Sequence, residues 1–124
     1  MTTILIVEDN EKNMKLARDL LQVKGYATLE AETGTDGVRL AKAHVPDLVL
    51  MDIQLPDING IDAFAQLRAD PATASIPVVA FTASVTPNDR SRISLAGFDG
   101  FIGKPISLKE FLDTVARLTS VRSP

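Results

Sequence analysis

Five short strand-like runs alternate with five helical patterns along the chain, and this alternation limits the possible folds more than any other feature. The runs are short and mostly apolar, which is typical of strands buried on both faces of a sheet. They are Ile4–Val7, Ala27–Ala31, Asp47–Met51, Pro77–Phe81 and Gly100–Ile102. Strict alternation of strands and helices predicts a parallel sheet covered by helices on both faces.

The helical patterns are predicted largely from their ends. Each begins with a residue whose side chain can cap a helix: Asn10, Thr33, Asn59, Thr86 and Ser107. Pro87 suits the first position of the fourth helix, and Gly97 is a typical residue for its end. The last helix has the clearest apolar stripe, which comprises Leu108, Phe111, Leu112, Val115 and Leu118.

Right-handed crossovers leave few ways to order five parallel strands, and the flavodoxin-like order 2-1-3-4-5 is the leading one. We therefore expect one α/β domain over residues 1–124, a three-layer sandwich with a five-stranded parallel sheet and five helices. In this order the direction of winding reverses between the first and third strands. Ligands bind at such a switch point, outside the carboxyl ends of the strands.

Both strands at this switch point end in acidic residues. The first runs into Glu8 and Asp9, and the third runs into Asp52. An aspartate after a strand often only caps the next helix. Residues 53–56 do not begin a helix, however, so Asp52 has no local partner of that kind. The predicted strand order places the three acids in one pocket.

A pocket of three acids needs a proton or a cation. Two carboxylates about 5 Å apart repel by roughly 3 kcal/mol at an effective dielectric constant near 20. Oxygen ligands without histidine or cysteine favour a hard cation, and a small open site suits Mg2+. The fourth and fifth strands add Thr82 and Lys104 at the same edge. A metal, a hydroxyl and an ammonium around Asp52 are the groups needed to transfer a phosphoryl group to it.

Composition excludes several other classes of protein. The net charge of -3 gives no electrostatic footprint for nucleic acid or an anionic membrane. The chain has no cysteine, which rules out disulfides and fits a cytoplasmic protein. No signal peptide or transmembrane segment is apparent. Only residues 119–124 follow the last helical pattern, so we expect no output domain.

These motifs together resemble the receiver domain of two-component response regulators, and the resemblance covers essentially the whole chain. The residues that carry it are Glu8-Asp9, Asp52 with Pro56 and Gly60, Thr82-Ala83 and Lys104-Pro105. Among receivers, the strings at 7–16 and 51–56 are similar to those of a single-domain regulator of cell division. The resemblance implies a phosphoacceptor switch rather than an enzyme, with Asp52 accepting a phosphoryl group from a phosphohistidine.

The resemblance also implies a magnesium site. Asp9 and Asp52 would bind Mg2+ directly, together with the backbone carbonyl of Gln54, and Glu8 would act through water.

A switch is implied by the same resemblance. Lys104 and Thr82 would contact the phosphoryl group, Phe101 stands where the family has its aromatic switch residue, and Lys104-Pro105 would be a cis bond. Because Phe101 lacks the hydroxyl of the commoner tyrosine, it cannot donate an outward hydrogen bond.

The expected partners are a histidine kinase, a histidine phosphotransfer protein, or both. A downstream protein would bind the face made by the fourth helix, fifth strand and fifth helix of what we expect to be a monomer. A receiver fragment of a larger hybrid kinase or regulator is one alternative. A flavodoxin-like FMN-binding protein is another, but the acids Glu8 and Asp9 would repel a phosphate after the first strand. An aspartate-nucleophile phosphohydrolase would need a substrate-binding cap, for which 124 residues leave no room.

Overall fold

The computed structural model describes residues 2–82, 87–104 and 106–121, and within these ranges the chain forms five strands and five helices. The strands are β1 (Thr3–Val7), β2 (Ala27–Ala31), β3 (Leu48–Met51), β4 (Val78–Thr82) and β5 (Gly100–Gly103). The helices are α1 (Glu11–Val23), α2 (Gly34–His44), α3 (Gly60–Ala69), α4 (Pro87–Ala96) and α5 (Leu108–Val121). The sheet is parallel with the order β2-β1-β3-β4-β5, which confirms the predicted flavodoxin-like fold.

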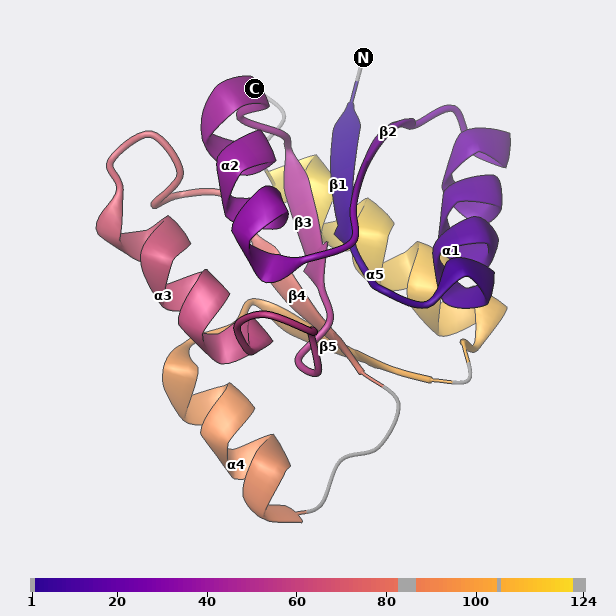
Figure 1. Ribbon diagram of the computed structural model, residues 1–124. Coiled ribbons are helices and arrows are strands. Elements are labelled where there is room, and N and C mark those ends of the chain that lie inside the picture. Colours follow the sequence, from indigo (N-terminus) through magenta and orange to yellow (C-terminus); the bar gives the residue numbers. More distant parts are fainter. Residues whose placement is uncertain (1, 83–86, 105, 122–124) are drawn as a thin grey trace.

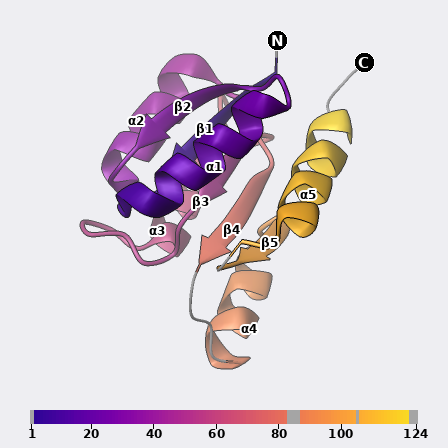
Figure 2. The same cartoon turned by 90° about the vertical axis from the view of Figure 1, so that its right-hand side faces the viewer.

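The helices form two layers, one on each face of the sheet (Figures 1 and 2). In β3, Leu48 and Leu50 pack toward α1 and α5, whereas Val49 and Met51 pack toward α2 and α3. Side chains alternate between the two faces of a strand, so a strand buried on both faces must be apolar throughout. This requirement explains the uninterrupted apolar run before Asp52.

Most helix ends agree with the sequence analysis. The side chains of Asn10, Thr33 and Asn59 accept backbone N–H groups in the first turns of α1, α2 and α3. Thr86 lies outside the described residues. Strand bounds differ from the predicted ones by one residue at most, as where β4 continues to Thr82.

One residue of the apolar stripe predicted for the last helix is exposed. Leu108 is 55% exposed, although it fits the apolar period of α5. Phe111 and Val115 are fully buried. Leu108 is the first residue of the helix, and periodicity alone could not exclude it from the buried face.

Helix α4 differs from the others because it carries almost no apolar face. Ile93 is its buried residue among those described, and Leu95 is 87% exposed. Its C-terminal end is held by the loop that follows, in which the Phe98 ring stacks on that of Phe64 in α3 with centroids 4.2 Å apart. Asp99 pairs with Arg68, with 2.7 Å between Oδ2 and Nη2. These two contacts join the segment after α4 to α3.

None of the helices in the described part of the chain is long and apolar enough to cross a membrane.

Candidate functional site

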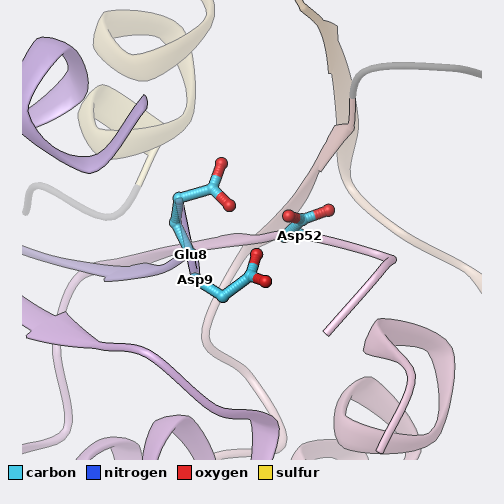
Figure 3. A group of neighbouring side chains, drawn as sticks. All are labelled: Glu8, Asp9 and Asp52. Carbon is cyan, nitrogen blue, oxygen red and sulfur yellow. The ribbon is translucent and has the colours of Figure 1, made fainter. Parts of the chain in front are cut away.

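The carboxyl ends of β1 and β3 bring the three predicted acids together. Val7 and Met51 are paired in register, and Asp52 continues the ladder by donating its N–H to the Val7 carbonyl at 3.0 Å. Figure 3 shows Glu8 and Asp9 leaving the end of β1, with the Asp52 carboxylate facing them. One carboxylate oxygen from each residue lies within 4.8 Å of the other two. The switch point of the fold is thus an acidic pocket.

Lys104 supplies the counter-charge of this pocket. Its Nζ contacts the Glu8 carboxylate and lies 3.2 Å from Asp52 Oδ2. The lysine side chain is only 7% exposed, and Nζ lies 4.7 Å from the centroid of the Phe81 ring. The ammonium therefore links the two buried carboxylates and leaves Asp9, which is exposed, on the open side of the pocket.

Glu8 has a strongly altered acidity. The residue is 1% exposed, and burial raises the pKa of its carboxyl from 4.5 to about 7. Asp52 adds to the rise through a hydrogen bond and its charge, while Lys104 opposes it. The Asn10 N–H donates to Glu8 Oε2 at 3.3 Å. Near neutral pH, Glu8 consequently changes its charge within the pocket.

We predict that Mg2+ binding strengthens as the pH rises from 6 to 8, because the metal competes with the proton on Glu8. Titrations followed by NMR at the two pH values will measure this change, and Glu8→Gln should remove most of it. Without metal, the raised pKa favours the protonated folded state, so the free energy of unfolding should fall as the pH rises from 4.5 to about 7. Equal Mg2+ affinity at pH 6 and 8 would contradict this assignment.

The predicted switch residues lie at the neighbouring strand ends. Thr82 is buried at the end of β4 and is paired with Gly103, and the Lys104 N–H donates to the Thr82 carbonyl at 3.0 Å. Phe101 in β5 is half-buried, with the guanidinium of Arg90 from α4 4.7 Å from its ring centroid. Pro105, and with it the predicted cis bond, lies outside the described residues.

The loop from β3 to α3 carries one further predicted ligand, Gln54. Its N–H donates to Asp52 Oδ1 at 3.0 Å, which fixes the orientation of the carboxylate. Sequence reasoning missed a second residue of this loop, Asp57, whose carboxylate binds the start of α2. The only sequence signal for it is an acid after Pro56, which predicts no particular partner.

The donor set fits Mg2+. Its side-chain ligands are carboxylates alone, which suits a hard cation, and the exposed position of Asp9 leaves room for the waters that Mg2+ retains. The Lys104 ammonium reduces the repulsion between Glu8 and Asp52 without occupying the exposed side.

Comparisons with known proteins agree with this geometry. Residues 4–116 match the family described as the response regulator receiver domain. The chain is 44% identical over 113 residues to the polar-differentiation response regulator DivK of Brucella ovis, covering 91% of this chain and 92% of that protein.

Two solved structures show the same likeness. The signal receiver domain of a histidine kinase from Syntrophus aciditrophicus is 31% identical, with a TM-score of 0.91 and coverage of 100% of this chain and 96% of that one. The receiver domain of a sensor histidine kinase from Pseudomonas aeruginosa PAO1, described with a magnesium ion coordinated in its active-site cleft, is 30% identical, with a TM-score of 0.89 and coverage of 96% and 98%. With its whole fold and nearly its whole sequence matched, this chain belongs to the receiver domains of two-component response regulators.

Proposed function

We propose that Asp52 accepts a phosphoryl group from the phosphohistidine of a kinase or phosphotransfer protein, in a reaction that requires Mg2+. The observation that carries this proposal is the meeting of Glu8, Asp9 and Asp52 with Lys104 at one strand edge. A single-domain role like that of DivK is supported by the similarity over nearly the full length of both chains. The protein would then signal through altered protein contacts or pass the phosphoryl group onward.

The chain's own groups would perform most of the chemistry. A carboxylate oxygen of Asp52 forms the new O–P bond while the N–P bond of the donor breaks, and the electron pair returns to the imidazole nitrogen. The Gln54 N–H holds Asp52 Oδ1, and Lys104 lies beside Oδ2, where it can pair with the phosphoryl oxygens. Bound Mg2+, held by Asp9, Asp52 and the Gln54 carbonyl with Glu8 acting through water, would neutralise charge on the transferring group.

Thr82 and Phe101 would carry the signal to the surface. The Thr82 hydroxyl would move toward the phosphoryl group, because a hydrogen bond to a charged acceptor is stronger than one to a neutral group. Phe101, two strands from Asp52 in the sheet, would fill the vacated space and change its contact with Arg90. Pro105 belongs to this proposed switch although it lies outside the described residues.

The downstream partner would bind the face formed by α4, β5 and α5. Of the two helices of this face, α4 carries Leu95, which is 87% exposed, and α5 begins with Leu108, which is 55% exposed. The proposal includes a monomeric receiver that acts in the cytoplasm.

The proposed function can be tested with a small phosphodonor. After incubation with acetyl phosphate and Mg2+, intact mass measurement should show the addition of one phosphoryl group, and fragmentation should place it on the peptide that contains Asp52. The same incubation with EDTA should leave the mass unchanged. Modification that persists in EDTA, or that maps to another residue, would refute the proposal.

A further inference from the structure

Asp57 belongs to the loop between β3 and α3, yet its carboxylate binds the start of another helix, α2. Oδ1 accepts the Gly34 N–H at 2.8 Å, and Oδ2 accepts the Thr35 N–H at 2.9 Å. These N–H groups are among the first of the helix, which have no partner within it. The contact joins residues 22 and 23 positions apart, so it is a tertiary link between the β3–α3 loop and the start of α2.

The link is electrostatically strong for an exposed carboxylate. Hydrogen bonds from the Thr35 side chain and from the backbone N–H groups of Thr35, Ile58 and Gly34 hold the pKa of Asp57 below its usual range. The positive end of the α2 dipole favours a negative charge at this position. With its pKa lowered in this way, Asp57 is ionised at neutral pH.

Two glycines show how closely the loop is packed. A Cβ on Gly34 would lie 2.5 Å from Ile58 Cγ1, beside the Asp57 contact. At the other end of the loop, a Cβ on Gly60 would lie 2.2 Å from the Asp52 carbonyl oxygen. The loop is therefore held from both sides, by α2 near Ile58 and by the first residue of α3 against Asp52.

The start of α2 is also connected to the other acid-bearing strand. Ala31, the last residue of β2, accepts the Glu8 N–H at 2.9 Å, and Gly34 follows three residues later. One hydrogen bond thus joins Glu8 to Ala31, and another joins Gly34 to Asp57. The chain from 31 to 34 connects the two. This path joins the Glu8 side of the pocket to the loop that contains Gln54.

We propose that Asp57 is a positioning residue that holds the β3–α3 loop, and with it the backbone of Gln54, in the arrangement that binds Mg2+. The inference rests on the proposed function, since it assigns a role in the same site. A loop held in place before the metal arrives loses less conformational freedom on binding. Asp57 would thus raise the affinity for Mg2+ without contacting either the metal or the phosphoryl group.

The test compares Asp57→Asn with Asp36→Asn. Asparagine keeps one acceptor for α2 but turns an NH2 group toward the second N–H. Asp36 also lies in the first turn of α2, but its carboxylate contacts Arg39 at 3.4 Å, so the control removes the same charge from the same helix end without touching the loop. Mg2+ titrations by NMR, without phosphodonor, should show about tenfold weaker binding for Asp57→Asn and an unchanged affinity for Asp36→Asn.

Two further measurements separate positioning from simple destabilisation. With acetyl phosphate, Asp57→Asn should need about tenfold more Mg2+ for half its maximal rate, while the rate at saturating Mg2+ stays within about twofold of the parent's. Gly34→Ala should also weaken Mg2+ binding, because the added methyl group would push Ile58 and the loop away from α2. Alanine favours the helix itself, so this loss would not come from a weaker helix.

Unchanged Mg2+ affinity in Asp57→Asn, or equal losses in both asparagine variants, would overturn the positioning role. If the parent binds Mg2+ but gains no phosphoryl group, the proposed function fails instead, and the metal titrations still decide the role of Asp57.

Discussion

Replacing Asp52 with asparagine is expected to abolish phosphorylation completely and to leave the fold intact. The amide nitrogen and oxygen of asparagine cannot act as the carboxylate nucleophile, and Glu8 keeps its contact with Lys104. The side-chain carbonyl oxygen of the new asparagine can still accept the Gln54 N–H that now binds Asp52 Oδ1. Intact mass measurement after treatment with acetyl phosphate and Mg2+ will show whether any phosphoryl group is gained.

The same substitution should also leave stability within about 1 kcal/mol of the parent's, or raise it. It removes one of two buried carboxylates that contact a single ammonium, and so relieves repulsion with Glu8. Asp62→Asn is the matched control, because Asp62 is an exposed acid in the first turn of α3. The control should be phosphorylated like the parent. Asparagine can deamidate to aspartate and so restore the acceptor, which Asp52→Ala cannot do. A phosphoryl gain in both Asp52 variants would disprove the assigned acceptor.

Replacing Lys104 with methionine should lower the free energy of unfolding by about 3 kcal/mol at pH 8 in EDTA. Methionine retains much of the apolar stem but leaves the buried carboxylates of Glu8 and Asp52 without their cation. Urea denaturation measures the loss. At pH 5.5 the deficit should shrink, because Glu8, with its pKa of about 7, is then protonated in the folded protein.

Mg2+ should restore stability to Lys104→Met more than to the parent, since the metal replaces a charge that the variant lacks. The control is Lys15→Met, which removes a lysine that is 68% exposed and paired with Asp19 on the surface of α1. It should cost less than about 0.5 kcal/mol and respond to Mg2+ as the parent does. A loss in Lys104→Met no larger than in Lys15→Met would show that the buried contacts contribute nothing to stability.

Much of the fold follows from local patterns. The four buried residues of β3 could be read as a strand because no amphipathic element is apolar at every position. Helix α4 was found from its ends, since a proline begins it and Gly97, with a φ of +97°, follows it. Its residues show no apolar period, so a search for amphipathic stripes alone would have missed it. Leu108 shows the opposite limit, because it fits the apolar period of α5 and is nevertheless exposed.

The site could be predicted from the sequence only because the strand order could be predicted. Once β1 and β3 are neighbours, Glu8, Asp9 and Asp52 must meet, because parallel strands end at the same edge. The pairing of Lys104 with Glu8 was not predictable, because it depends on side-chain reach across the edge. The role of Asp57 was equally hidden, since it depends on the approach of α2 to a loop distant in sequence.

The two close glycine contacts also determine how this site can evolve. At positions 34 and 60 a single added methyl group would meet Ile58 and the backbone of Asp52 respectively, so both positions are closed to substitution unless the loop shifts. Gln54 and Pro56, on the same loop, have exposed side chains. A laboratory library of this loop should therefore randomise 54 and 56 and hold both glycines constant. Side chains can then vary at these exposed positions without loss of the packing beneath them.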